Sequence, residues 1–167
     1  MPIFVTDRTQ ADVDEAKALY EKILTDGYSS LTADEQTAWA TDLKGMYNAS
    51  DFQRVTGQMS DIVTLFTTYY GYTPNVTLTT WTTPSSGSSQ PSPTKQDYDD
   101  FGEAVRTICE AVGKSSSSFA NIPYGMNYQT ANEIEKYLQD AYNGLNASKN
   151  FTFAICGEEI AEADFWR

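Results

Sequence analysis

Residues 50–71 read SDFQRVTGQMSDIVTLFTTYYG, and this stretch decides the fold class. Its apolar residues recur at spacings of three and four, which is the period of one face of an α-helix. The stripe consists of Phe52, Val55, Met59, Ile62, Val63 and Phe66. Ser50 followed by Gln53 has the form of a capping box, and Gly71 is a typical helix stop. Gly57 lies inside this predicted helix and indicates the close approach of a neighbouring element.

The same start signal predicts four further helices. A Ser or Thr with an acid or amide three residues later satisfies backbone N–H groups that a helix start leaves unpaired. The four pairs are Thr9 with Asp12, Thr32 with Glu35, Thr94 with Asp97, and Thr130 with Glu133. We expect the first three of these helices to end near Gly27, Gly45 and Gly113. Predicted core-facing residues are Val13, Ala16, Tyr20, Ile23 and Leu24 in the first, and Trp39 and Leu43 in the second.

Two short stretches have the alternation of β-strands. Residues 76–81, VTLTTW, are rich in β-branched side chains, and residues 151–155, FTFAI, alternate in the same way. Between the two parts of the chain, residues 84–93 consist mainly of Pro and Ser and are typical of a flexible linker. The sequence therefore predicts a mainly α protein, a five-helix bundle-like domain with a small two-stranded β element.

The two halves of the chain resemble each other. Residues 9–12, TQAD, match residues 94–97, TKQD, and residues 46–48, MYN, echo residues 126–128, MNY. Each half is predicted to end in a short strand. One interpretation is a degenerate duplication of a helical hairpin plus strand; the other is that any two amphipathic hairpins look this similar. The predicted parts are a first helical half at 1–82, a Pro/Ser-rich linker at 83–93, and a second helical half with an acidic tail at 94–167.

Composition excludes several classes of function. The chain has 167 residues, with 23 Asp and Glu against 11 Lys and Arg, and no histidine. A pI near 4.2 argues against nucleic acid or an anionic membrane as a partner. Without histidine the commonest general base and zinc ligand are missing. Many acids stand in first turns of predicted helices, where the helix dipole favours them.

No nucleophile or metal site is set up in the sequence. Cys109 lies on the apolar stripe of its predicted helix, and Cys156 ends the second predicted strand. We interpret the two cysteines as reduced thiols of a protein made in a cytoplasm, with a disulfide as the open alternative. The prediction is a protein that is not an enzyme and binds no metal or cofactor.

Aromatic side chains exceed what one helical core of this size requires. The chain has 11 Tyr, 8 Phe and 3 Trp, many of them at helix ends or in loops. Tyr and Trp combine apolar area with a polar group, which suits a protein interface or a sugar-stacking surface; alternatively, these rings plug the ends of the bundle. The candidate interface or ligand-binding residues are Tyr69, Tyr70, Tyr72, Trp81, Tyr124, Tyr128, Phe165 and Trp166.

Three segments carry a resemblance to a known group. Residues 7–14, DRTQADVD, residues 31–36, LTADEQ, and residues 47–55, YNASDFQRV, resemble small proteins or terminal domains encoded in the structural modules of tailed phages and prophages of gut Firmicutes. The resemblance covers nearly the whole chain. It departs at the C-terminus, where residues 151–158 replace the aromatic-rich ending of that group.

The resemblance implies a virion protein of the tail, baseplate or fibre, made in the bacterial host cytoplasm and without catalytic residues. Its partners would be other phage structural proteins or copies of itself in a homo-oligomer. One alternative is an adhesion module that binds a glycan or receptor on the host surface. A second alternative is an acidic inhibitor whose charged face mimics nucleic acid for a host defence protein.

Overall fold

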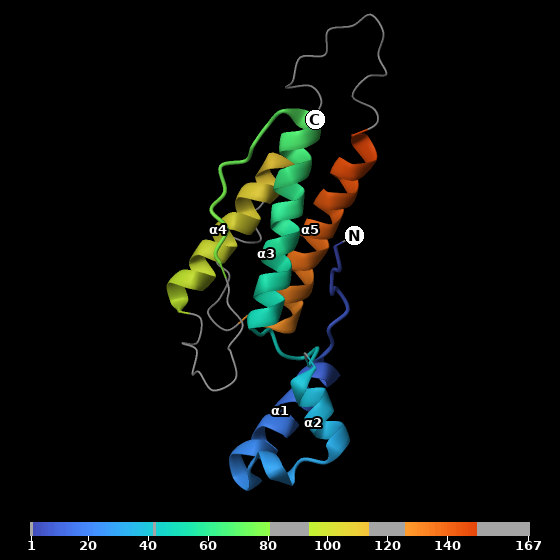
Figure 1. The fold of residues 1–167 in the computed structure, drawn as a ribbon, viewed down its shortest axis with the longest axis vertical. Coiled ribbons are helices and arrows are strands. Elements are labelled where there is room, and N and C mark those ends of the chain that lie inside the picture. Colours follow the sequence, from blue (N-terminus) through green and yellow to red (C-terminus); the bar gives the residue numbers. More distant parts are fainter. Residues whose placement is uncertain (1, 42, 81–93, 114–125, 150–167) are drawn as a thin grey trace, which may run out of the picture.

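The computed structural model describes residues 2–41, 43–80, 94–113 and 126–149. These residues form five α-helices, which confirms the prediction of a mainly helical protein. The elements in chain order are α1 (Gln10–Asp26), η1 (Tyr28–Ser30), α2 (Ala33–Ala40), α3 (Ala49–Leu65), η2 (Phe66–Tyr70), α4 (Lys95–Ala111) and α5 (Tyr128–Ser148). Helices α3, α4 and α5 lie side by side as a bundle, and α1 and α2 form a hairpin that projects from one end of it (Figure 1).

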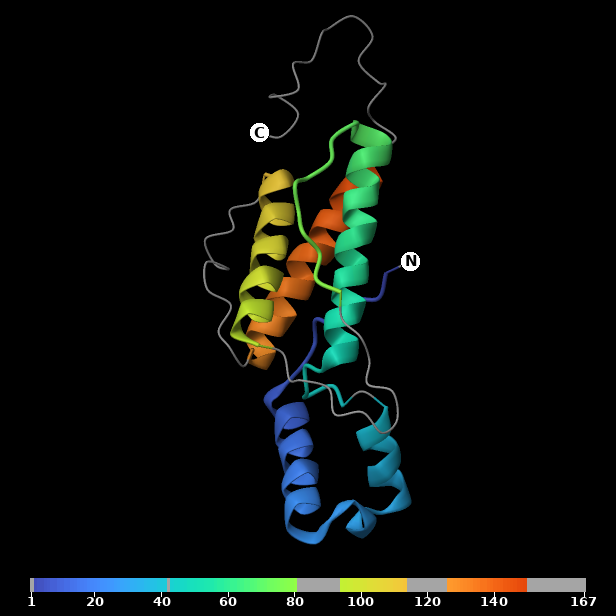
Figure 2. The ribbon, with the colours of Figure 1, turned by 60° about the vertical axis from the view of Figure 1, so that its left-hand side comes forward.

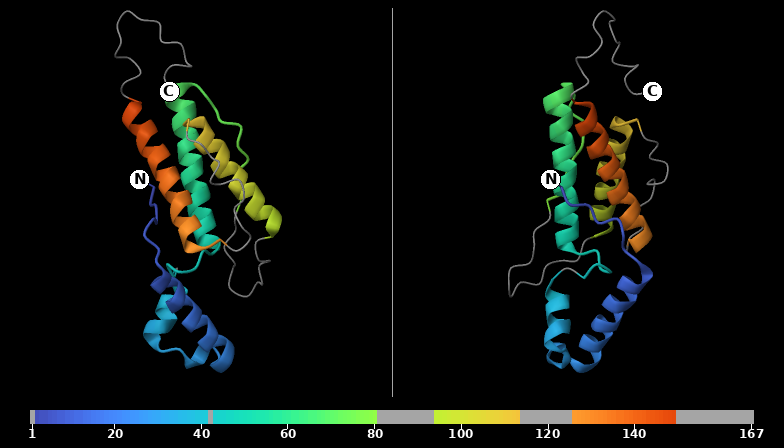
Figure 3. Two further views of the ribbon diagram at one scale, coloured as in Figure 1. Left: turned by 180° about the vertical axis from the view of Figure 1, so that it is seen from behind. Right: turned by 90° about the vertical axis from the view of Figure 1, so that its right-hand side faces the viewer.

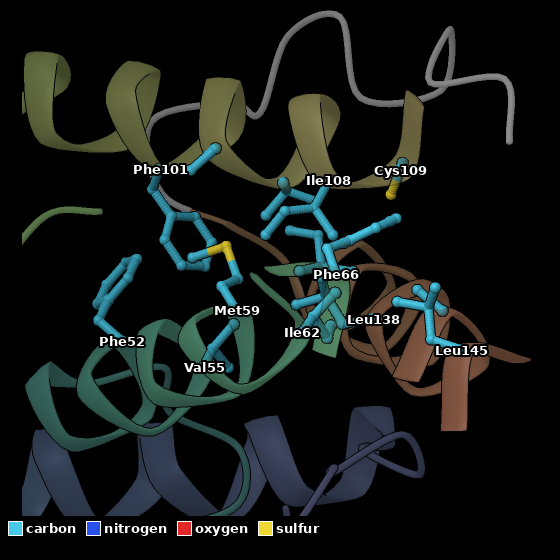
Figure 4. Packing of buried hydrophobic residues seen from close by; sticks show 14 residues of the cluster. Phe52, Val55, Met59, Ile62, Phe66, Phe101, Ile108, Cys109, Leu138 and Leu145 are labelled. Carbon is cyan, nitrogen blue, oxygen red and sulfur yellow. The ribbon is translucent and has the colours of Figure 1, made fainter. Parts of the chain in front are cut away.

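The hydrophobic core lies between the three bundle helices (Figure 4). Each helix contributes one stripe at spacings of three and four, as the sequence predicts. The buried stripes are Phe52, Val55, Met59, Ile62 and Phe66 from α3, Phe101, Ala104, Val105, Ile108 and Cys109 from α4, and Ile134, Leu138, Ala141 and Leu145 from α5. The core thus draws on residues from both sides of the 83–93 segment. The predicted division of the chain into two halves stays a prediction.

Three of the five predicted capping boxes are confirmed. Thr9, Thr32 and Thr94 each accept a hydrogen bond from the backbone N–H three residues on, and the acid at that position accepts one from the backbone of the cap. Gly27 ends α1 with a φ of 82°, which is accessible to glycine at little cost. These helix boundaries are therefore encoded locally.

The predicted starts of the other two helices are wrong. In α3 the cap is Asn48, whose side-chain oxygen accepts from the N–H of Ser50 at 2.9 Å. In α5 the cap is Asn127, which accepts from the N–H of Thr130 at 2.8 Å. The hydroxyl residues at which we placed the starts lie inside the first turn, because an Asn just upstream offers an equally good acceptor.

The strand predicted at 76–81 is also wrong, because residues 72–80 form no strand. They run back along α3 beside α4 (Figure 2), and Val76 and Leu78 lie half-buried against the core. All three bundle helices run in the same direction (Figure 1), so the chain must return along the bundle after α3. The alternating apolar side chains of this segment thus pack against the bundle helices and do not pair in a sheet. The partner strand predicted at 151–155 lies outside the described residues.

The structure contradicts the predicted roles of two glycines, Gly57 as a site of close approach and Gly45 as a helix end. Gly57 is exposed on α3, and a Cβ added there would have no neighbour within 4 Å, so no element of the described residues approaches it. The close approach is at Gly45, where an added Cβ would lie 1.9 Å from the carbonyl oxygen of Asp12. Helix α2 ends at Ala40, before Leu43 and Gly45. The backbone at Gly45 therefore packs directly on the start of α1.

Candidate interaction surfaces

Four charged side chains meet at the end of the bundle from which the hairpin projects. Arg8 precedes α1, Asp51 and Arg54 lie on the first turns of α3, and Glu135 lies on α5 with no exposed surface. Arg8 contacts Asp51 and Glu135, each at 2.9 Å. Arg54 contacts Asp51 at 2.6 Å and also pairs with Glu135. The backbone of Arg8 is held in turn by the amide side chain of Asn132, which bonds both its N–H and its carbonyl.

This ionic cluster (Arg8, Asp51, Arg54 and Glu135) also holds the N-terminal segment. Glu135 accepts a hydrogen bond from the N–H of Val5 at 2.7 Å. The carbonyl of Ile3 accepts from Arg54 at 3.1 Å and from the side-chain amide of Gln58. Residues 3–8 are therefore fixed to α3 and α5, and they position the start of α1.

The electrostatics of the cluster are balanced, with two guanidinium groups facing two carboxylates. Partial burial opposes the charge of Arg54, but its hydrogen bonds to Glu135 and Asp51 outweigh that cost and raise its pKa. Burial raises the pKa of the Tyr47 hydroxyl, and the negative charges of Glu135 and Asp51 act in the same direction. The Tyr47 ring lies 5.1 Å from the guanidinium of Arg8. The cluster thus keeps its charges paired, as a structural joint requires.

The α1–α2 hairpin has little core of its own. Helix α1 buries only Ala16 and Leu19, and α2 buries no residue at all. On one flank of the pair, Lys22 bonds Glu35 at 2.7 Å. In the views of Figure 3 both helices stand clear of α3, α4 and α5. The hairpin is therefore held by its base rather than by packing on the bundle.

Apolar side chains of the hairpin are exposed where a core was predicted. Tyr20 is 50% exposed and Leu24 is 67% exposed, so their assignment to the core is wrong. They lie one turn apart on α1, and the Trp39 ring from α2 stacks on Tyr20 with centroids 6.4 Å apart and planes 11° apart. We call Tyr20, Leu24 and Trp39 the hairpin face. Tyr28 at the turn is 47% exposed as well.

Three of the predicted site residues gather at the opposite end of the bundle. Tyr70 is half-buried, and its hydroxyl donates to the carbonyl of Leu145 at 2.8 Å. Tyr69 and Tyr72 are each about half exposed. The ammonium of Lys149 lies 5.3 Å from the centre of the Tyr69 ring. Tyr70 thus closes this end of the bundle, while the other two rings offer surface.

A fourth predicted residue, Tyr128, lies at the start of α5 and far from the other three. It borders a hollow of about 340 Å³ between α1 and α5. The lining residues are Gln10, Val13, Lys17, Gly45, Met126, Asn127, Tyr128 and Gln129. Tyr128 therefore belongs to the junction of hairpin and bundle. The remaining predicted residues, Trp81, Tyr124, Phe165 and Trp166, lie outside the described part of the chain, as does Cys156.

Sequence reasoning missed both the ionic cluster and the hairpin face. Arg8 and Glu135 are 127 positions apart, and no local pattern links them. The hairpin face did carry a signal, because Tyr20 and Leu24 have helical spacing, but the same spacing describes a buried stripe. Only the arrangement of the helices distinguishes the two cases.

Comparison of the chain with protein-family models, curated proteins and solved structures finds no match. No helix among the described residues is long and apolar enough to cross a membrane. Within the same residues, no group of three or more Cys, Asp or Glu side chains is arranged to hold a metal ion.

Proposed function

We propose that this chain is a non-enzymatic structural or assembly protein of a phage or prophage virion, in the tail, baseplate or fibre. It acts through contacts with other phage structural proteins or with copies of itself in an oligomer. It is made in the cytoplasm of the bacterial host and is carried in the particle.

The observation that carries this proposal is the hairpin that projects from the bundle with apolar side chains exposed. Leu24, at 67% exposure, and its aromatic neighbours leave water only when another surface covers them. The ionic cluster fixes the base of the hairpin, so a partner meets a positioned element. A projecting element with a fixed base suits a role in assembly.

The resemblance supplies the virion context. Its two most specific segments, residues 7–14 and 47–55, contain Arg8 in one case and Asp51 and Arg54 in the other. These residues meet in the ionic cluster. The segments that carry the resemblance thus contain residues of the ionic cluster that positions the hairpin. This favours the same arrangement of the cluster in the phage proteins that the chain resembles.

The test is the protein content of particles released by the bacterium that encodes the chain. Particles are purified by density gradient and analysed by quantitative mass spectrometry, with an abundant cytoplasmic enzyme as the control for contamination. We expect the chain at a fixed ratio to the tail proteins and the enzyme at background. Absence of the chain from particles, together with a monodisperse monomer that binds no tail or head protein, would refute the proposal.

A second candidate function rests on the exposed rings of Tyr69 and Tyr72. Two half-exposed aromatic rings at one end of a bundle offer a surface on which a sugar can stack. This candidate is an adhesion module for a host surface glycan. A glycan array decides it: binding should be lost in a Tyr69→Ser/Tyr72→Ser variant, and an array without signal removes the candidate.

A further inference from the structure

The α1–α2 hairpin is an incomplete layer. A helix pair in a folded domain gains most of its stability by burying an apolar face against a second layer. Here α2 has only 8 residues and buries none of them, and α1 buries two of its 17. One flank of α1 carries the exposed aromatic and aliphatic side chains of Tyr20 and Leu24. A second layer on that flank would complete the unit.

The exposed flank is continuous with the hollow at the base of the hairpin. Gln10, Val13, Lys17, Tyr20 and Leu24 follow one another at spacings of three and four, so they lie on one side of α1. The first three line the hollow, and the last two belong to the hairpin face. From the first to the last the helix rises about 21 Å. This length accommodates about four turns of a partner helix.

The charge of the hairpin determines which kind of partner helix fits on this flank. Residues 10–41 hold seven carboxylates and two lysines, and the whole chain has a net charge of −12. Lys22 is paired with Glu35, which leaves six carboxylates against Lys17, the lysine that lies on the flank itself. A second copy on this flank would bring like charges together as its apolar groups were buried. A partner with cationic side chains beside its apolar stripe would instead be attracted.

We infer that the flank of α1 from the hollow to Leu24 docks an amphipathic helix of a different protein, one whose apolar stripe is bordered by Lys and Arg. The apolar stripe covers Tyr20, Leu24 and Trp39. The cationic border faces the exposed carboxylates of Asp14 and Glu21, which follow Val13 and Tyr20 along α1. This inference rests on the proposed function, since it names the chemistry of the partner that the assembly role requires.

The experiment uses two synthetic helical peptides of about 20 residues with an identical Leu stripe, bordered by Lys in one and by Glu in the other. Binding to the full chain is followed by amide chemical shifts in NMR titrations. Two variants of equal charge are compared: Tyr20→Ser/Leu24→Ser alters the hairpin face, and Tyr69→Ser/Tyr72→Ser alters exposed rings at the other end. Circular dichroism melts verify that both variants are folded.

We expect the Lys-bordered peptide to shift the signals of the hairpin face. Its Kd should rise about tenfold or more in the hairpin variant and change less than about twofold in the control, because central apolar contacts carry most of the energy of an interface. If the hairpin variant and the control variant bind the Lys-bordered peptide equally well, the binding depends on net charge alone and not on the hairpin face. That result, equal binding of the Glu-bordered peptide, or absence of binding would overturn the inference.

A further outcome that would overturn the inference is self-association. If the chain dimerises in analytical ultracentrifugation and Tyr20→Ser/Leu24→Ser makes it monomeric, the flank is covered by a second copy. These readouts do not involve particles, so they are separate from the test of the proposed function. A chain that is present in particles but fails to bind the Lys-bordered peptide retains the proposed function and loses this inference.

Discussion

Replacing Glu135 by Gln tests whether the ionic cluster joins the hairpin to the bundle. The Glu135 carboxylate is fully buried, forms an ion pair with Arg8, and accepts hydrogen bonds from Arg54 and from the N–H of Val5. Gln has nearly the same shape but only one acceptor oxygen, and its NH₂ group would face donors. Two guanidinium groups would then share the single carboxylate of Asp51.

The expected loss follows from the burial of this group. Removing one partner of a buried, hydrogen-bonded ion pair costs about 3–5 kcal/mol, because the remaining charge stays buried without compensation. Small proteins unfold in urea with a slope of about 1–3 kcal/mol per M. At a slope of about 2, the midpoint of unfolding should fall by about 1.5–2.5 M.

The assay is urea unfolding followed by circular dichroism, with Glu133→Gln as the matched control. Glu133 lies on the same helix and is exposed, so its substitution should change stability by less than about 0.5 kcal/mol. If the two variants unfold within about 1 kcal/mol of each other, the cluster does not hold the joint and this reasoning is refuted.

Two further predictions concern backbone contacts and helix caps. Gly45→Ala should destabilise the chain by about 1–3 kcal/mol in urea unfolding, since its Cβ would collide with the backbone of Asp12. Gly57→Ala, at an open helix position, should instead stabilise it by about 0.5–1 kcal/mol, and the same sign for both would contradict the geometry. Hydrogen bonds from Thr94 lower the pKa of Asp97 below 3.8, so this cap stabilises at higher pH and is lost as pH falls through the lowered pKa. Thr94→Ala should raise the pKa of Asp97 in an NMR titration and cost about 1 kcal/mol near neutral pH, with a smaller difference in acid.

Local signals in the sequence were sufficient for three of the five helix starts. The boxes at Thr9, Thr32 and Thr94 are confirmed because each satisfies its own helix start within four residues. Asn48 and Asn127 were missed because a hydroxyl pair lay close downstream, and both candidates offer an acceptor. Whether the Asn or the downstream hydroxyl residue caps the helix depends on how far upstream the chain can remain helical.

Features that depend on distant parts of the chain were not predictable. The stripes of α3, α4 and α5 identify core faces, but the same spacing at Tyr20 and Leu24 produced an exposed face. Val76 and Leu78 alternate as in a strand, yet they pack on helices because the chain has to return along the bundle. The pairing of Arg8 with Glu135 has no local signature.

The most direct test of the role of the hairpin is photocrosslinking in released particles. A photoreactive amino acid is placed at Leu24 in one variant and at exposed Asp61 on α3 in another, and crosslinked peptides are identified by mass spectrometry. We predict that Leu24 crosslinks to another virion protein, at a segment rich in Lys and Arg, and that Asp61 does not crosslink to that segment. Particles that contain the chain but show no crosslink from Leu24 to another protein would contradict a docking role for the hairpin.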